Sequence, residues 1–275
     1  MPDTASAVRV REALADGTMA LAAASVDTPR LDAELLLAEA MGVDRARLVL
    51  DSGSLLPPGV LETFEALILR RVAREPVAYI LGRRDFRRLT LAVDPRVLIP
   101  RPETELLVEV GLGFPEGFRV ADVGTGSGAV ALALKDERPD LDVVGIDLNE
   151  DAVAVARANA SRLGLAASFV VGDLLDGVDG RFDAVLANLP YVASGAALAP
   201  EIALYEPADA LLAGPDGLDV IRRLVSQVDG VSVVALEIGF DQGDAVAGLM
   251  RSAGFASVER LRDLAWHERV VVGRR

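Results

Sequence analysis

Short runs rich in β-branched residues alternate with helical stretches from Arg119 onward, and this alternation constrains the fold more than any other feature of the chain. In order, the runs are RVADVG, LDVVGIDL, ASFVVGD, FDAVLAN and VSVVALEIG. Crossover helices between such strands place them parallel in one sheet, with helices on both faces. The last segment, ASVERLRDLAWHERVVVGRR, predicts an antiparallel hairpin at the sheet edge. We therefore expect an α/β fold with a doubly wound, mostly parallel, seven-stranded sheet that binds its ligand at the carboxyl ends of the strands.

The first 80 residues show helical periodicity instead, with almost no strand signal. In PGVLETFEALILRRVARE, the apolar residues recur at the spacing of one helix face and are Val60, Phe64, Leu67 and Ile68. We expect a small helical domain over residues 1–80, a linker with a short hairpin over 81–100, and the α/β domain over 101–275.

Composition and charge argue against several classes of protein. The chain has no cysteine, which excludes disulfides, thiolate metal sites and cysteine nucleophiles. No apolar run approaches the roughly 18 residues of a membrane helix, so we expect a cytoplasmic protein that does not contact membranes. A formal net charge of −14, with Lys135 the only lysine, disfavours direct binding of nucleic acid. Histidine and carboxylate residues show no metal-ligand spacing, so we expect no metal site.

A glycine-rich turn in ADVGTGSGAVALAL lies between a predicted strand and a predicted helix. Its glycines allow the backbone to approach a ligand where any Cβ would clash, and the amide groups of the helix N-terminus point at that ligand. The candidate cofactor-binding residues of the turn are Gly124, Thr125, Gly126, Ser127 and Gly128. The spacing also satisfies the dinucleotide fingerprint, so the turn alone leaves NAD and other adenosine cofactors open.

Two aspartates end the next two predicted strands. Asp147 follows the turn by about 20 residues, where a carboxylate can bind both hydroxyls of a ribose. Asp173 ends the third strand in VVGDLL, where its side chain or the backbone at Leu174 can meet an adenine amino group. An alternative is that Asp173 only caps the following helix.

The stretch VLANLPYV predicts a buried strand that ends in Asn188-Leu189-Pro190-Tyr191. An amide or exocyclic amine nitrogen is a poor nucleophile, because its lone pair is delocalised. If the Asn188 side-chain oxygen and the Leu189 carbonyl each accept one N–H, the lone pair turns toward an electrophile. Pro190 favours an extended backbone at Leu189, and Tyr191 can stack on a planar substrate group. The alternative is an ordinary turn after a strand.

With these segments the sequence resembles the HemK/PrmC family, S-adenosylmethionine-dependent methyltransferases that modify the glutamine of the Gly-Gly-Gln motif in class 1 peptide chain release factors. The resemblance covers nearly the whole chain. It rests on PRLDAELLLAEAMG, PVAYILGRRDF, LIPRPETELLVE, DVGTGSGAVALAL, GIDLNEDAVAVARANA, EPADALLAGPDGLDVIRRL, LEIGFDQGDAV and ERVVVGR. The most specific of these is LIPRPETELLVE, since other methyltransferases share the glycine turn but not that linker.

The resemblance implies a protein-(glutamine-N5) methyltransferase of the class I methyltransferase fold, a monomer whose helical domain recognises the release factor. S-adenosylmethionine would be bound by the glycine turn, by Asp147 at the ribose, by the Asp173-Leu174 corner at the adenine, and by Asn188. Catalysis would rest on Asn188, Pro190 and Tyr191, and substrate binding on the whole tetrapeptide, Asn188, Leu189, Pro190 and Tyr191.

One residue of the tetrapeptide departs from the family pattern, which is Asn-Pro-Pro-Tyr. Leu189 stands at the second position, and Asn-Leu-Pro-Tyr is also the form found in methyltransferases that modify adenine in ribosomal RNA. The alternatives are therefore a related methyltransferase that acts on another protein, or one that acts on adenine amino groups in nucleic acid. The glycines alone would also fit a dinucleotide oxidoreductase, whereas a non-catalytic module would be expected to lack Asn188 or Asp147.

Overall fold

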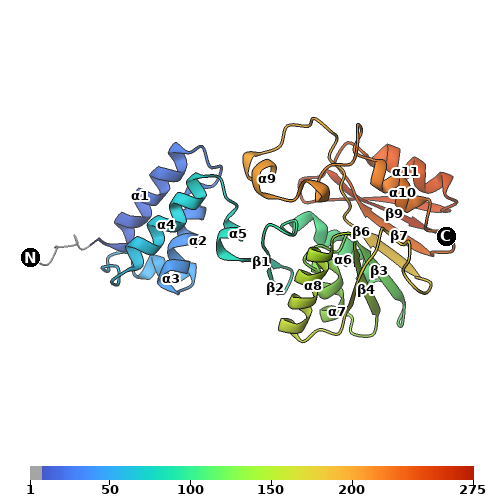
Figure 1. Ribbon diagram of the computed structural model, residues 1–275, viewed down its shortest axis with the longest axis horizontal. Helices are drawn as coiled ribbons and strands as arrows, with labels where there is room; N and C mark the ends of the chain where they lie inside the picture. Colours follow the sequence, from blue (N-terminus) through green and yellow to red (C-terminus); the bar gives the residue numbers. More distant parts are fainter. Residues whose placement is uncertain (1–7) are drawn as a thin grey trace, which may run out of the picture. The chain divides into compact units, whose positions relative to one another are not determined.

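The computed structural model describes residues 8–275 as two compact units (Figure 1). The first unit ends at Gly82 and also contains Ala199–Tyr205. The second unit consists of Arg83–Leu198 and Glu206–Arg275. The polypeptide therefore passes from one unit to the other three times.

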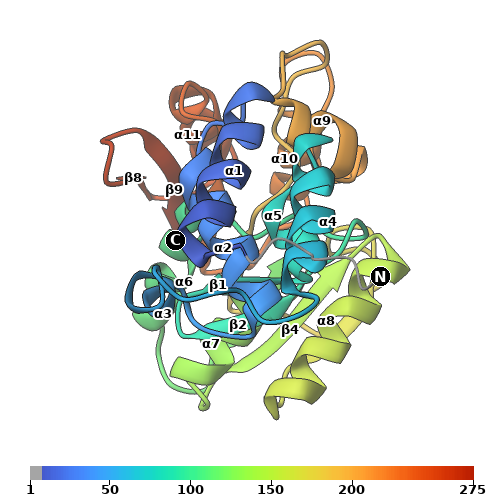
Figure 2. The ribbon, with the colours of Figure 1, turned by 90° about the vertical axis from the view of Figure 1, so that its left-hand side faces the viewer.

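The first unit is a bundle of short helices with an apolar core of its own (Figure 2). Its helices are α1 (Val10–Ala23), α2 (Pro29–Met41), α3 (Arg45–Leu50), α4 (Val60–Val72), α5 (Val77–Leu81) and α9 (Pro200–Tyr205). Pro29 lies in the first turn of α2, and Gly42 ends this helix in the left-handed conformation, with φ 65°. The apolar face that the sequence predicts on α4 is buried at Phe64 and Ile68.

Helix α9 is held in the first unit by partly buried ion pairs. Glu201 accepts hydrogen bonds from Arg71 Nη2 at 2.9 Å and from Arg74 Nη2 at 2.7 Å. Arg71 Nε also donates to Asp32 Oδ2 at 2.7 Å, and both of these side chains are buried. Because a buried charge is costly unless it is paired, this cluster ties α9 to the helical bundle.

The second unit begins with an antiparallel hairpin of β1 (Arg83–Phe86) and β2 (Leu89–Ala92). A short 3-10 helix, η1 (Pro102–Thr104), and α6 (Glu105–Leu112) follow. The fully buried Asn159 joins the hairpin to the glycine turn: its Oδ1 accepts from the backbone N–H of Ala92 at 2.8 Å, and its Nδ2 donates to the Ser127 carbonyl at 3.0 Å.

The centre of the second unit is a seven-stranded sheet in the order β5-β4-β3-β6-β7-β9-β8. Its strands are β3 (Arg119–Val123), β4 (Asp142–Asp147), β5 (Ser168–Val171), β6 (Ala184–Ala187), β7 (Val233–Glu237), β8 (Ser257–Arg262) and β9 (Glu268–Arg274). Neighbouring strands from β5 to β7 are parallel, and β9 is antiparallel to both β7 and β8. The predicted doubly wound, mostly parallel sheet with a terminal hairpin is confirmed.

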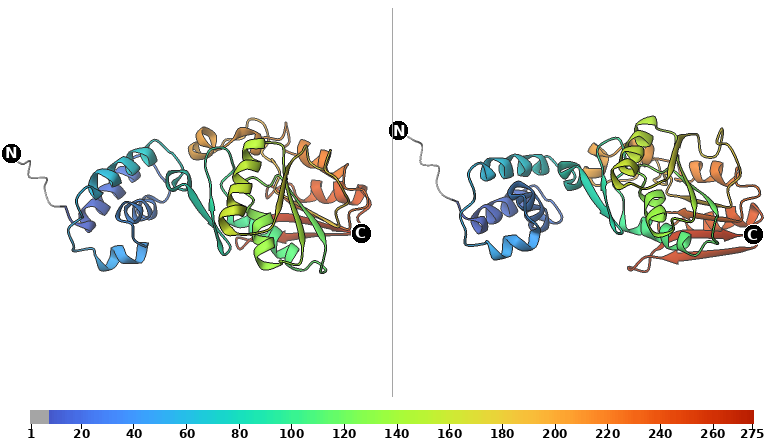
Figure 3. Two further views of the ribbon diagram at one scale, coloured as in Figure 1. Left: turned by 60° about the horizontal axis from the view of Figure 1, so that its bottom comes forward. Right: turned by 90° about the horizontal axis from the view of Figure 1, so that it is seen from below.

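Helices cover both faces of this sheet (Figure 3). One apolar core contains residues of α6, α7 (Ala129–Glu137) and α8 (Glu150–Leu163). The other contains residues of α10 (Asp219–Val225) and α11 (Gly243–Ser252). The strand order switches direction between β3 and β6, which opens a crevice at the carboxyl ends of these strands. No helix among residues 8–275 has the length and apolar character that a membrane span requires.

Candidate active site

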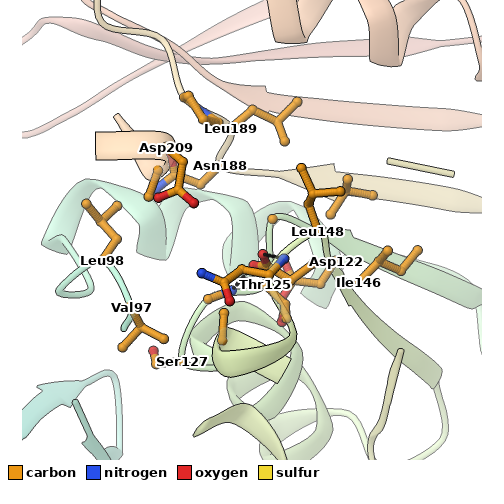
Figure 4. A pocket seen from close by; sticks show the side chains of 18 of the residues that line it. Val97, Leu98, Asp122, Thr125, Ser127, Ile146, Leu148, Asn188, Leu189 and Asp209 are labelled. Carbon is orange, nitrogen blue, oxygen red and sulfur yellow. Dashed lines mark hydrogen bonds between the residues drawn. The ribbon is translucent and has the colours of Figure 1, made fainter. Parts of the chain in front are cut away.

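A cavity lies at the carboxyl ends of β3, β4 and β6, at the switch in strand order (Figure 4). Most of the site residues predicted from the sequence line it, namely Gly124, Thr125, Gly126, Ser127, Asp147, Asp173, Leu174, Asn188, Leu189 and Pro190. Gly128 and Tyr191 are not among its lining residues. Figure 4 shows Asn188 on one side of the cavity, beside Asp209 of the 3-10 helix η2 (Ala208–Ala210), and Thr125 on the other side.

Two glycines of the turn serve different purposes. Gly124 has φ 74°, and a Cβ there would lie 3.1 Å from the backbone oxygen of Asn188. Gly128 has φ 84°, and a Cβ there would meet Leu132 at 3.0 Å and Ala156 at 3.3 Å. Gly124 therefore allows the turn to approach the end of β6, whereas Gly128 allows the start of α7 to pack closely against α8.

Asp122 is buried beneath the turn, and no sequence pattern singles it out as a site residue. Its Oδ2 accepts from Thr125 Oγ1 at 2.6 Å and from the backbone N–H of Ala131 at 3.1 Å. Burial raises the pKa of this carboxyl to about 6, while the two hydrogen bonds oppose the rise. The contacts join the last part of β3 to the first turn of α7, and so they hold the shape of the glycine turn.

Asp147 ends β4 with both carboxylate oxygens directed by the backbone. Oδ2 accepts from the N–H of Gly126 at 2.9 Å, and Oδ1 accepts from the N–H of Asn149 at 3.0 Å. Burial raises the pKa of Asp147, and these backbone hydrogen bonds oppose the rise. Each oxygen has a second lone pair, so the carboxylate can still accept hydrogen bonds from two neighbouring hydroxyl groups.

The corner at Asp173 and Leu174 borders the cavity beyond β5. Asp173 Oδ2 accepts from Arg223 Nη2 at 2.6 Å on the surface, and Leu174 is buried with φ 60°. The alternative reading, that Asp173 caps a helix, is wrong, because no helix lies between β5 and β6 in the fully described residues 168–187.

Asn188 follows β6 directly, and its side chain is held by a residue of η1. Its Nδ2 donates to Thr104 Oγ1 at 3.0 Å, and Thr104 itself is only 4% exposed. The Thr104 hydroxyl also hydrogen-bonds to the Glu237 carboxyl, so its proton is engaged there and its oxygen accepts from the donor end of the Asn188 amide. The oxygen Oδ1 is thereby left to accept hydrogen bonds from a bound molecule.

Tyr191 is anchored from behind by a buried carboxyl group. Its hydroxyl donates to Glu237 Oε1 at 3.3 Å, and its backbone oxygen accepts from Gln242 Nε2 at 3.0 Å. Glu237 is 1% exposed, and burial raises its pKa to about 7, although hydrogen bonding from Thr104 and Tyr191 opposes the rise. Burial also raises the pKa of Tyr191. Thr104 therefore holds Asn188, and Glu237 holds Tyr191, although neither of these supporting residues belongs to the tetrapeptide.

The segment that follows α9 is fixed to the linker by Glu206. Its side chain is buried, with Oε1 accepting from Arg101 Nη2 at 2.5 Å and Oε2 accepting from the backbone N–H of Ile99 at 3.2 Å. Asp209, three residues later in the chain, lines the cavity. No role is predicted from the sequence for Thr104, Asp209 and Glu237, because their spacing along the chain gives no sign that they lie near the site.

The described residues contain no group of three or more histidine, cysteine, aspartate and glutamate side chains arranged to hold a metal ion. The polar side chains around the cavity are instead carboxylates, hydroxyls, two arginines and two amides, and backbone N–H groups lie beside them. Such a set suits hydrogen bonding to an organic ligand.

Comparison with known proteins agrees with this arrangement. Residues 12–82 match the PrmC N-terminal domain, and residues 102–214 match the methyltransferase small domain. A release factor glutamine methyltransferase of Rhodospirillum rubrum is 42% identical over 280 residues, which cover 98% of this chain and 86% of the relative. This chain belongs to the release factor glutamine methyltransferase family. The resemblance noted in the sequence is thus confirmed.

Further comparisons support the family and the fold. A family member of Caulobacter vibrioides is 42% identical over 262 residues, which cover 91% of each chain. Among solved structures, a methyltransferase from Pyrococcus furiosus matches with a TM-score of 0.53 and 17% identity, over 76% of this chain and 96% of that chain. This structural likeness shows the shared methyltransferase fold.

Proposed function

We propose that this chain transfers the methyl group of S-adenosylmethionine to the side-chain amide nitrogen of the glutamine in the Gly-Gly-Gln motif of a class 1 peptide chain release factor. The observation that carries this proposal is the position of Asn188, which lines the cavity opposite the glycine turn and is oriented by Thr104. Membership of the family supports the choice of substrate.

The residues around the cavity fit S-adenosylmethionine. Asp147 can accept hydrogen bonds from both ribose hydroxyls, and the Asp173-Leu174 corner is assigned to the adenine. The remaining contacts of the cofactor are assigned to residues 124–127 of the turn and to Asn188, while Gly128 supports the turn through helix packing. When bound, S-adenosylmethionine supplies an electrophilic methyl group on a sulfonium centre.

The tetrapeptide orients the nucleophile. Asn188 Oδ1 and the backbone oxygen of Leu189 accept the two N–H groups of the glutamine amide, which turns the nitrogen lone pair toward the methyl group. As the N–C bond forms, the S–C bond breaks and its electron pair stays on sulfur. The amide proton is released to water after transfer, so the reaction needs no strong base. Pro190 keeps the backbone of Leu189 extended. Tyr191 flanks the planar amide of the substrate from the edge of the cavity.

Leu189 replaces a family proline without removing the group that the mechanism requires. Its side chain is 4% exposed and packs in the apolar core that also contains residues of α10 and α11. The backbone oxygen, which accepts the substrate N–H, is the same in both residues. We therefore assign the same chemistry to Asn-Leu-Pro-Tyr in this chain.

The wider assignment follows from the same proposal. The helical domain, residues 1–80, and the linker, residues 81–100, bind the body of the release factor, while residues 101–275 carry out methyl transfer. The enzyme acts as a cytoplasmic monomer and does not bind nucleic acid directly.

A second candidate reaction is methylation of an adenine amino group in nucleic acid, which the form Asn-Leu-Pro-Tyr favours. A net charge of −14 with one lysine opposes it, because nucleic-acid binding draws much of its affinity from neutralised phosphates. A related methyltransferase that acts on another protein is the third candidate.

Methyl transfer to three substrates separates these candidates. The substrates are a class 1 release factor, the same factor with its Gly-Gly-Gln glutamine changed to alanine, and ribosomal RNA, each incubated with radiolabelled S-adenosylmethionine. We expect label only in the unmodified release factor. Label in RNA would support the adenine reaction, and undiminished label in the alanine variant would reject the glutamine as the target.

A further inference from the structure

We infer that an exposed apolar surface next to the tetrapeptide binds the domain of the release factor that presents the target glutamine. This surface, here called the aromatic rim, consists of Phe240, Leu264 and Trp266. The inference rests on the proposed function and assigns a role to residues that the catalytic mechanism does not use.

The aromatic rim exposes three large apolar side chains to solvent. Phe240 is 63% exposed, Trp266 is 77% exposed, and Leu264 is fully exposed. Leu264 and Trp266 lie in the connection between β8 and β9, which Figure 2 shows at the border of the second unit. The ring of His267 in the same connection lies 5.8 Å from the ring of Phe240, centroid to centroid. Exposed apolar side chains beside a binding site are typical of protein–protein contacts.

Hydrogen bonds hold the connection between β8 and β9 in a defined conformation. Asp263 Oδ1 accepts from the backbone N–H groups of Ala265 at 2.8 Å and His267 at 2.9 Å, and Asp263 Oδ2 accepts from Arg269 Nε at 2.8 Å. Trp266 has φ 66°, a left-handed conformation that costs energy in a residue with a large side chain. The chain therefore maintains a strained turn whose effect is to hold Trp266 in solvent.

The aromatic rim is continuous with the catalytic tetrapeptide. Gln242 accepts from the Gly239 N–H at 2.9 Å and donates to the Tyr191 backbone oxygen at 3.0 Å, so the loop that contains Phe240 is hydrogen-bonded to the tetrapeptide. Phe240 also follows β7, which is parallel to β6, and hence lies at the same edge of the sheet as Asn188. A protein whose glutamine enters the cavity would therefore meet the rim.

The side chains of the aromatic rim suit a protein domain better than nucleic acid as the binding partner. A Gly-Gly-Gln loop offers only one side chain that can be gripped, so tight binding must come from contacts that flank it. Aromatic side chains are the residues that most often carry such binding energy. Nucleic acid would instead require free cations, but the three arginines of β8 and β9 beside the rim are paired: Arg269 with Asp263, Arg260 with Asp244 and Glu268, and Arg262 with Glu268.

Steady-state methylation of an intact release factor by a double variant, Phe240→Ser with Trp266→Ser, tests the inference. We expect KM for the release factor to rise about tenfold or more, as for truncated aromatic anchors of an interface, and kcat to stay within about twofold. The dissociation constant of S-adenosylhomocysteine should not change. The matched control is Val171→Ser, because Val171 is 51% exposed on β5, at the opposite edge of the sheet.

The other outcomes reject the inference in distinguishable ways. An unchanged KM in the double variant, with normal methylation by the unmodified enzyme, would overturn the docking role and leave the proposed function intact. A parallel loss of kcat and of S-adenosylhomocysteine binding would assign the rim a structural role instead. A dimer in sedimentation that the double variant abolishes would assign the rim to a second copy of this chain. No methylation of the release factor by the unmodified enzyme would reject both proposals together.

Discussion

Thr104 and Asn188, separated by 84 positions in the sequence, are joined by a hydrogen bond of 3.0 Å between Asn188 Nδ2 and Thr104 Oγ1. Thr104 belongs to LIPRPETELLVE, one of the segments on which the resemblance to the family rests. The contact gives that segment a chemical role, because it decides which end of the Asn188 amide is offered to a substrate.

Replacing Thr104 by valine should slow methyl transfer without weakening cofactor binding. Valine has nearly the same shape but cannot accept the Asn188 N–H, so the amide loses its fixed orientation. A hydrogen bond of this kind contributes about 0.5–1.5 kcal/mol, which corresponds to a rate loss of about 2- to 13-fold. Single-turnover rates measure the effect, and Thr104→Ser should restore most of the rate. Equal rates for valine and threonine would contradict the role of this contact.

Replacing Asn188 by alanine should have a much larger effect, because it removes the acceptor that orients the nucleophile. We expect single-turnover rates to fall by about two or more orders of magnitude. The affinity for S-adenosylhomocysteine, measured by calorimetry, should change much less. A variant as fast as the unmodified enzyme would refute the positioning mechanism.

Asp147→Ala should selectively weaken the binding of the cofactor. The carboxylate lies at the cavity with a free lone pair on each oxygen, and each charge-assisted hydrogen bond that is lost costs about 1.5–3 kcal/mol. Calorimetry with S-adenosylhomocysteine measures this loss, and NAD should not bind to the unmodified protein. Affinity equal to that of the unmodified protein would exclude Asp147 from the ribose contact.

Glu237 should make the stability of the protein depend on pH. Burial raises its pKa from an ordinary 4.5 to about 7, the carboxylate of Glu103 adds to the rise, and Thr104, Tyr191 and Arg269 oppose it. Between these two values the folded state holds a proton that the unfolded state has lost. The free energy of unfolding therefore falls as pH rises from about 4.5 to 7.

Glu237→Gln should remove that part of the pH dependence, on the order of 1–3 kcal/mol. Chemical denaturation at pH 4.5, 6 and 7.5 measures it for both proteins. Glu259→Gln on β8 is the control, since the Glu259 side chain is 59% exposed. If the two glutamine variants had the same pH profile as the unmodified protein, the buried carboxyl would not titrate in this range.

The local elements were largely determined by the sequence. The alternation of apolar runs and helices predicts the parallel strands and the terminal hairpin, because the periodicity of a strand or helix is set by its own residues. The turn at Gly124 and Gly126 and the carboxylate of Asp147 were recognisable for the same reason. They lie at the ends of predicted strands, and such ends meet at one edge of a parallel sheet.

Contacts between distant segments were decided only by the tertiary structure. Thr104 contacts Asn188, Glu237 contacts Tyr191, and α9 joins the helical bundle through Glu201. The positions of these residues in the sequence do not predict the contacts. Each depends on which strands become neighbours and on how the loops between them pack. Hydrogen bonds and ion pairs of this kind form between groups that only folding brings together, whereas helices, strands and turns follow from interactions among residues close in the chain.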